Sequence, residues 1–345
     1  MKVKHLVLAI IAMALTTSVN AQSAASSAAN EPQKQSNVQS FCDKHLRLSG
    51  YLQGGFQWTE NDKSTFYLRR ARVSLTGDFL EHKLDYRLQV DMAGSPKICD
   101  LYVRYRPFTQ LGAEIGQFKL PFSLENELYG PTTFELIEYS FLTTYLARND
   151  GRYDGVAATG RGLGAQLYGG FIQRDGFSII NYNIGVFNGS GINAKDNNKS
   201  KDAIARLIIK PIKHLSLSGS FMYGESNFAG NEYLRNPRWS VGAIYDDARI
   251  TARAEYAAAK FGDQSVDAFY VLGGYHFDKG WSVAARYEFM NDSFERYADM
   301  DRITIGGVYK PIKYLRLQLN YSYTMHKNLT DMNASGVNLM VSAIF

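Results

Sequence analysis

Apolar and polar residues alternate with a period of two along most of the chain beyond residue 45. In the last segment, Val337, Leu339 and Val341 share one face, while Asn338 and Ser342 share the other. This alternation is typical of a β-strand with one apolar and one polar face. It predicts sixteen strands, near residues 45–58, 65–78, 83–93, 98–107, 111–119, 156–171, 176–188, 201–211, 214–224, 237–247, 248–260, 265–277, 280–292, 300–311, 313–325 and 334–345.

The connections between these strands alternate in length. The short ones include 81–83 and 278–279, and the long ones are 120–155, 189–200, 225–236, 292–299 and 326–333. An even strand count, with short turns at one end and long loops at the other, is typical of bacterial outer-membrane barrels. The pattern therefore predicts an all-β fold, a 16-stranded antiparallel transmembrane β-barrel over residues 44–345.

The first residues predict export. Lys2 and Lys4 precede an apolar run at 6–15, and Val19 and Ala21 are the small residues that a signal peptidase requires. A membrane-spanning helix needs about 20 apolar residues, so this shorter run predicts a cleaved signal peptide over 1–21. Residues 22–43 are rich in Ser, Ala, Gln and Asn, which predicts a disordered segment before the barrel.

The polar face of the strands is expected to form the lumen. It carries arginines in the middle of strands, and an arginine that faces lipid at the membrane midplane costs about 2–4 kcal/mol. The apolar face, with Tyr, Phe and Trp near the strand ends, would then meet lipid. We use parity for the face that a residue's odd or even position in a strand assigns to it. Arg69 is charged but has the parity of the apolar face, so we expect it to face lipid near the outer end, where its charged head can reach water.

Other function classes find little support in the sequence. The net charge of +5 is small and no basic run occurs, so we expect no nucleic-acid partner. His, Cys, Asp and Glu do not cluster as metal ligands or as catalytic groups, so we expect no metal, no cofactor and no enzymatic activity. Cys42 and Cys99 are expected at opposite ends of the barrel, whereas a disulfide needs Cα atoms within about 7 Å.

Two stretches resemble the phosphate-selective porin O and P family of outer-membrane porins. They are FYLRRARVSLTG at 66–77 and GQFKLPFSLE at 116–125. The terminal Phe345 is similar to the C-terminal aromatic residue that such barrels present to the barrel-assembly machinery. The resemblance implies a homotrimeric porin in the outer membrane of a Gram-negative bacterium, with a third loop, here about 120–155, that folds into the pore and constricts it.

Charged residues on the lumen face are the candidate site. A ring of guanidinium groups in a narrow aqueous pore favours anions, because guanidinium is always charged. The candidate pore-lining, anion-binding residues are Arg70, Arg72, Arg87, Arg104, Arg206, Arg253, Arg286 and Arg316. The alternative is that these arginines pair with acids on neighbouring strands and only keep the lumen wet.

The long third loop adds the candidate constriction residues Lys119, Glu125, Glu127, Glu135, Glu138 and Arg148. If this loop lies inside the barrel, its carboxylates would face the wall arginines and set up a field across the pore. The resemblance implies basic residues on this loop in phosphate-selective members, whereas this loop is net acidic. The sequence therefore favours a weak anion preference over a strict preference for phosphate.

The function expected from these observations is passive diffusion of small hydrophilic solutes and anions through an outer-membrane porin. The alternative is a barrel that acts as a surface adhesin or receptor through its loops. A receptor would be expected to enlarge several outer loops, whereas only one loop here exceeds about fifteen residues. The loop lengths therefore favour the porin.

Overall fold

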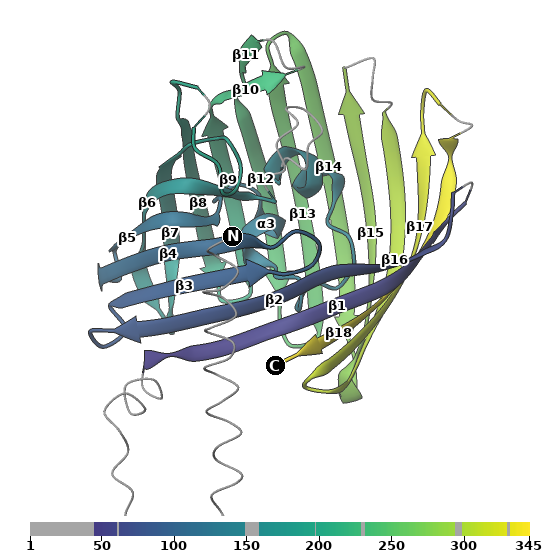
Figure 1. The fold of residues 1–345 in the computed structure, drawn as a ribbon, viewed down its shortest axis with the longest axis horizontal. Helices are drawn as coiled ribbons and strands as arrows, with labels where there is room; N and C mark the ends of the chain where they lie inside the picture. Colours follow the sequence, from purple (N-terminus) through teal and green to yellow (C-terminus); the bar gives the residue numbers. More distant parts are fainter. Residues whose placement is uncertain are drawn as a thin grey trace, which may run out of the picture. The chain divides into compact units, whose positions relative to one another are not determined.

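The computed structural model describes residues 45–60, 62–148, 159–196, 198–228, 232–293, 299–329 and 332–345. In this part of the chain, sixteen antiparallel strands form a closed barrel in the order β1-β18-β17-β16-β15-β14-β13-β12-β9-β8-β7-β6-β5-β4-β3-β2 (Figure 1). The predicted barrel is confirmed. The predicted signal peptide and the segment 22–43 lie outside the described residues and stay predictions.

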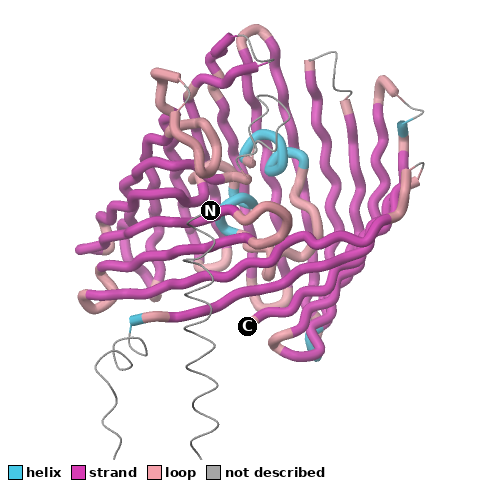
Figure 2. Tube along the Cα trace, in the orientation of Figure 1, coloured by secondary structure: helices cyan, strands magenta, loops and turns pink. Residues whose placement is uncertain are grey.

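The barrel strands are β1 Arg47–Thr59, β2 Thr65–Phe79, β3 Leu84–Asp91, β4 Lys97–Phe108, β5 Leu111–Lys119, β6 Arg161–Arg174, β7 Phe177–Phe187, β8 Asp202–Ile212, β9 Leu215–Tyr223, β12 Arg238–Asp246, β13 Ile250–Phe261, β14 Gln264–His276, β15 Trp281–Asp292, β16 Met300–Ile312, β17 Leu315–His326 and β18 Ala334–Ile344. The short helices are α3 Leu124–Leu128, the π-helix η1 Leu142–Ala147 and the 3-10 turn η2 Asp278–Gly280. Figure 2 shows that α3 and η1 lie within the ring of strands.

Two details differ from the predicted elements. The loop predicted at 225–236 contains a hairpin, β10 Glu225–Phe228 and β11 Glu232–Arg235, which forms a separate two-stranded sheet. The sixth strand begins at Arg161, and its predicted start near residue 156 lies outside the described residues. Its glycine-rich start carries too few side chains for alternation to mark where the strand begins.

Both ends of the barrel chain meet at one rim. Gly50 and Phe345 exchange two backbone hydrogen bonds, of 2.8 and 3.0 Å, and these close β1 against the end of β18. The same end carries the short connections, such as the β4–β5 and β16–β17 turns. We call it the short-turn rim, and we call the opposite end, where β5–β6 and β17–β18 are joined, the long-loop rim.

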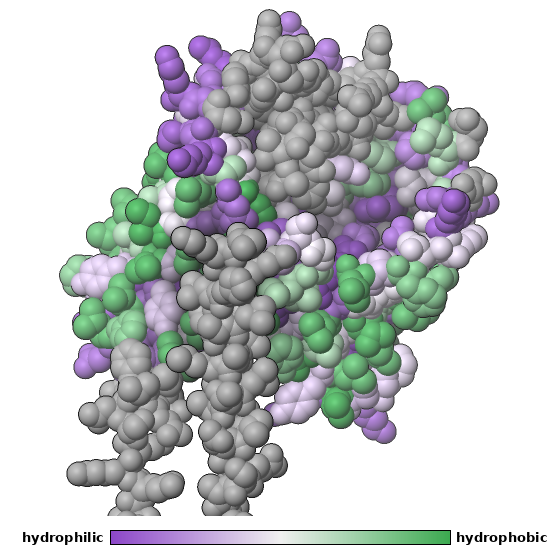
Figure 3. Space-filling view, viewed as in Figure 1, coloured by the Kyte–Doolittle hydropathy of each residue, from purple (hydrophilic) through white to green (hydrophobic). Residues whose placement is uncertain are grey.

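The outer face of the barrel is apolar. Outward side chains such as Phe66, Leu68, Ile115 and Ile305 are more than half exposed in the isolated chain. Figure 3 shows apolar side chains gathered over the strands and polar ones at the upper rim. A band of this kind belongs in lipid, because no water is available there to solvate polar groups. Among the described residues, none of the helices is long and apolar enough to cross a membrane.

The C-terminal residue gives a first testable prediction. The ring of Phe345 is 56% exposed and lies over Gly50, where a Cβ atom would come within 2.6 Å of the ring. We expect the Phe345→Ala variant to be exported but to insert into the outer membrane in lower amounts, since the ring at the end of the last strand is the expected assembly signal. Phe277→Ala removes another exposed ring outside the barrel strands and serves as the control. Wild-type amounts of heat-modifiable barrel in the Phe345→Ala variant would contradict the prediction.

Cys99 lies at an irregularity in β4. Gln89 pairs with Asp100 and Val90 pairs with Ile98, so Cys99 is an extra residue in the strand. Such a β-bulge turns two consecutive side chains to one face, and both Cys99 and Asp100 are buried. Cys42 lies outside the described residues, and the expectation that the two thiols stay unbridged remains a prediction.

Candidate functional site

The loop between β5 and β6 lies inside the barrel and is held there by apolar packing. Its side chains Leu124, Phe134, Leu136, Leu142 and Leu146 are at most 2% exposed. They belong to one apolar cluster with inward-facing side chains of β12 to β16. Fully burying a large apolar side chain stabilises by about 1.5–3 kcal/mol. Packing of several such residues is therefore the main force that holds the loop.

The inner face of β14 is apolar where the loop covers it. Val266, Ala268, Tyr270 and Leu272 point inward and are at most 1% exposed. The rule that the polar face forms the lumen is therefore wrong for this strand. Here the loop, and not water, packs against the barrel wall, so the apolar side chains of β14 are not exposed to water.

All four glutamates predicted on the loop pair with arginines of the wall. The pairs are Glu125–Arg286 at 3.8 Å, Glu127–Arg206 at 2.5 Å, Glu135–Arg253 and Glu138–Arg69. The four arginines come from four different strands, β15, β8, β13 and β2. The expectation that loop carboxylates face wall arginines is therefore met, but three of the pairs are in direct contact, and only Glu125 and Arg286 are as far as 3.8 Å apart. Direct pairing neutralises the loop acids and leaves no wide gap across which they could set up a field.

Arg69 faces the lumen, and the expectation that it faces lipid is wrong. Gln53 pairs with Arg70 and Gly54 pairs with Leu68, so Arg69 is the extra residue of a β-bulge in β2. Its guanidinium donates to both carboxylate oxygens of Glu138. Burial acts to raise the pKa of Glu138, but the Arg69 guanidinium outweighs it and lowers that pKa to about 2. Glu138 therefore stays ionised and paired down to strongly acidic pH.

Two further acids of the wall bind the loop backbone. Glu255 accepts hydrogen bonds from the Ser123 hydroxyl at 2.9 Å and from the Leu124 N–H at 3.1 Å. Glu288 accepts from the Phe141 N–H at 2.5 Å. Both acids lie on the polar face of their strands in the sequence, but the sequence gives no reason to assign them to the loop. That assignment depends on where the loop turns, which the alternation of residues does not encode.

Arg70 and Arg316 bind no carboxylate. Arg316 donates to the carbonyl oxygens of Phe134 and Pro131, the latter at 3.4 Å. Arg70 donates to Gln53 at 3.0 Å, and Gln53 donates to the same Pro131 carbonyl at 3.1 Å. Within the described ranges, neither arginine has a carboxylate oxygen within 4.0 Å. Their positive charges therefore remain uncompensated by direct ion pairs.

One internal cavity, of about 350 Å³, lies between the loop and the wall of β1 to β6. We call it the basic cavity, because its charged lining residues are the bases Arg72, Arg87, Arg104, Lys119 and Arg161 and the acids Asp100, Glu114 and Glu127. Arg87 and Arg104 are its most open bases, with side chains 36% exposed. Sequence parity identified Arg72, Arg87 and Arg104, and Lys119 was expected as a constriction-loop residue. It missed Arg161, which has the same parity along β6 as the outward-facing Leu163 and Leu167.

The bases of this cavity are partly paired. Arg72 contacts Asp91 at 2.8 Å, Arg104 contacts Asp85 at 3.0 Å, and Arg161 contacts Asp100 at 2.6 Å. The Lys119 ammonium donates to the Asn126 carbonyl at 2.7 Å. The expected lumen and its alternative, cross-strand pairing, are therefore both present in the same wall. The bases outnumber the acids among the residues that line the cavity, which do not include the paired Asp85 and Asp91.

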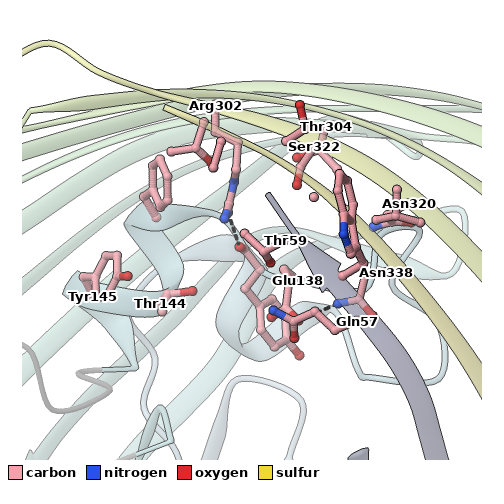
Figure 4. Close-up of a pocket in the computed structure, with 18 residues that line it drawn as sticks. Gln57, Thr59, Glu138, Thr144, Tyr145, Arg302, Thr304, Asn320, Ser322 and Asn338 are labelled. Atoms are coloured by element: carbon pink, nitrogen blue, oxygen red, sulfur yellow. Dashed lines mark hydrogen bonds between the residues drawn. The ribbon is translucent and has the colours of Figure 1, made fainter. Parts of the chain in front are cut away.

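A second internal cavity, of about 430 Å³, lies toward the long-loop rim (Figure 4). Its walls are polar side chains of β1 and β16 to β18 and the loop residues Glu138, Tyr139, Phe141, Thr144 and Tyr145. Arg302 and Glu138 are its only charged lining residues in the described chain. We call it the neutral cavity.

The remaining predicted site residues lie away from open cavities. Arg253 and Arg286 have fully buried side chains beneath the loop, and Arg206 is 3% exposed against Glu127. Arg148 is buried, with its guanidinium 4.8 Å from the ring centroid of Tyr139. Residues 149–155 of the predicted loop lie outside the described residues. In the described ranges, His, Cys, Asp and Glu form no group that could hold a metal ion.

Comparison with known proteins gives one family and one fold. The family model described as phosphate-selective porin O and P matches residues 49–343. The anion-selective porin from Comamonas acidovorans superposes with a TM-score of 0.68 at 15% identity, over 87% of this chain and 99% of that chain. OmpT of Vibrio cholerae in trimer form superposes with a TM-score of 0.65 at 14% identity, over 87% of this chain and 99% of that chain. The outer-membrane channel DcaP of Acinetobacter baumannii superposes with a TM-score of 0.64 at 14% identity, over 87% of this chain and 97% of that chain. A search of curated protein sequences found no match.

Proposed function

This chain belongs to the phosphate-selective porin O and P family and forms an outer-membrane channel for small solutes, and we propose that this channel has a weak preference for anions. Phosphate would be one of the anions it admits. The basic cavity is the observation that carries the proposal, because five bases and three acids line it. An aqueous path with a basic lining raises the local concentration of anions.

The pairing of the loop glutamates supports the same preference. Each of the four carboxylates lies against a wall arginine, so the net acidic loop contributes little negative field of its own. Arg70 and Arg316 add positive charge without a paired carboxylate. Screening over about 8 Å at physiological salt limits the reach of each charge, so the preference should be modest and strongest at low salt.

We further propose that the loop constricts the pore, and that residues 1–21 direct export and are removed. A homotrimer is the expected assembly, because OmpT of Vibrio cholerae, with the same fold, was solved as a trimer. Outer-membrane lipid would cover the apolar outer face, and the barrel-assembly machinery would recognise Phe345.

A set of three sugars tests the proposal. Glucuronate, glucose and glucosamine share one pyranose ring and carry a negative, a neutral and a positive charge at neutral pH. From proteoliposomes at low salt, we expect glucuronate to leave about two- to threefold faster than glucosamine, with the difference shrinking at high salt. Equal rates, or faster loss of glucosamine, would contradict the anion preference. The absence of any flux above that of empty liposomes would contradict the channel itself.

A further inference from the structure

The neutral cavity has the size and lining of a small-molecule site. Its volume of about 430 Å³ falls within the range of about 300–1,000 Å³ that is typical of ligand pockets. Figure 4 shows Arg302, Thr304 and Ser322 on the barrel wall and Thr144 and Tyr145 on the loop. The cavity thus has a wall of hydroxyl and amide groups and a floor supplied by the loop.

The two charges of this cavity are already compensated. Glu138 is bound by both terminal nitrogens of Arg69, and Arg302 contacts Glu288 at 2.7 Å. A second nitrogen of Arg302 donates to the Tyr139 carbonyl at 3.3 Å. An anion would have to displace Glu288 or approach Glu138. The lining therefore suits a neutral ligand, in contrast to the basic cavity.

Several hydrogen-bonding groups of the cavity are unused. The Thr304 hydroxyl is buried and has no hydrogen-bond partner in the described part of the chain, and the residue is only 4% exposed. Gln57 and Ser322 also line the cavity, and their side chains form no hydrogen bond with any described residue. Buried polar atoms are normally paired, so an orphaned hydroxyl in a cavity wall indicates a partner from solvent or from a ligand.

The floor of the cavity is aromatic. Phe141 and Tyr145 stack with their ring centroids 6.2 Å apart and their planes 23° from parallel. The guanidinium carbon of Arg302 lies 4.2 Å from the centroid of Phe141, and Tyr145 is half-buried and lines the cavity. An aromatic ring presents an apolar face on which a ring-shaped ligand with apolar C–H groups can stack.

We propose that the neutral cavity binds an uncharged polyhydroxylated solute, a small sugar, between the Tyr145 ring and the hydroxyl and amide groups of Thr304, Ser322 and Gln57. Such a ligand offers many hydroxyl groups to the unused polar atoms and an apolar ring face to the floor. This site goes beyond the anion preference and does not depend on it, because the two rest on different cavities.

Conductance block tests the site. Maltose is added to the full-length protein in a planar bilayer, and poly(ethylene glycol) of matched hydrodynamic size controls for simple occlusion. We expect maltose to reduce the current saturably and poly(ethylene glycol) to reduce it without saturation. Loss of one hydrogen bond in Thr304→Val should weaken maltose block about fivefold, and loss of the ring face in Tyr145→Leu should weaken it by a similar factor.

A matched variant controls for buried threonine itself. Thr251 is also buried with an unpartnered hydroxyl in the described chain, but it does not line the cavity. Maltose should therefore block the current through the Thr251→Val channel as strongly as it blocks the wild-type current. Non-saturable maltose block in wild type would overturn the proposal, as would block that Thr304→Val and Tyr145→Leu leave unchanged. Reversal potentials of the same channels report the anion preference separately, so a failure of one proposal is distinguishable from a failure of the other.

Discussion

Replacing residues 126–146 by a short glycine linker is expected to raise the single-channel conductance about twofold or more. These residues supply most of the loop side chains in the apolar cluster with β12 to β16, and they line both internal cavities. They therefore occupy part of the cross-section of the barrel that water would otherwise fill. Removing them should widen the narrowest part of the path, which sets the resistance.

A second loop provides the control for this deletion. The hairpin β10–β11 forms a separate sheet near the rim (Figure 1), and its replacement by the same linker should leave the conductance near the wild-type value. Both variants are first checked for heat-modifiable barrel, because the deletion uncovers the apolar inner face of β14. A folded deletion variant with unchanged conductance would show that residues 126–146 do not constrict the pore.

The second large effect is expected from the buried pair between Glu135 and Arg253. Their side chains are 7% and 0% exposed, and the Arg253 guanidinium also lies 3.8 Å from the ring centroid of Tyr129. Removing one partner of a buried pair leaves an unpaired charge and costs about 3–5 kcal/mol. In Arg253→Met, we expect this cost to reduce the free energy with which the loop docks on the barrel wall. The expected results are faster hydrogen exchange over residues 124–146 and greater current noise.

Two further variants identify the cause. The double variant Glu135→Gln/Arg253→Met removes both charges, so it should recover much of the docking free energy that the single variant loses. Arg47 pairs with Asp78 at 2.6 Å but its side chain is 66% exposed, so Arg47→Met should change stability by about 1 kcal/mol or less. Equal exchange rates in Arg253→Met and wild type would show that this pair does not hold the loop.

The strands were predictable because their signal is local. Alternation over about ten residues marks each strand, and the alternation of short and long connections indicates a barrel with both ends at one rim. The failures occur where parity does not report the face. Arg161 at the start of β6 has the parity of the outward-facing Leu163 but points inward, and the inner face of β14 is apolar like its outer face.

The β-bulges could not be predicted from one strand. Arg69 and Cys99 are each a single extra residue, and the register shift that turns them inward is defined only by the partner strands β1 and β3. Parity counted along β2 alone therefore sent Arg69 to the wrong face. The consequence is functional, because Arg69 is the partner of Glu138.

The contacts of the loop could not be predicted from the sequence either. The four glutamates were recognisable as loop acids, but their pairing with arginines on four strands depends on the path of the loop through the barrel. That path is set by apolar packing and by hydrogen bonds from backbone groups to Glu255 and Glu288. Since these interactions connect residues that lie far apart in the sequence, no local pattern encodes them.

The reversal potential of single channels in a KCl gradient at low salt tests the central claim, that wall bases set the field once the loop acids are paired. Wild type is predicted to be anion-selective. The variant Arg87→Gln/Arg104→Gln, which neutralises the two most open bases of the basic cavity, is predicted to shift toward cations. Arg174→Gln, at an exposed turn with its side chain 65% exposed, should remain like wild type. A cation-selective wild-type channel, or a reversal potential that the double variant leaves unchanged, would contradict the account.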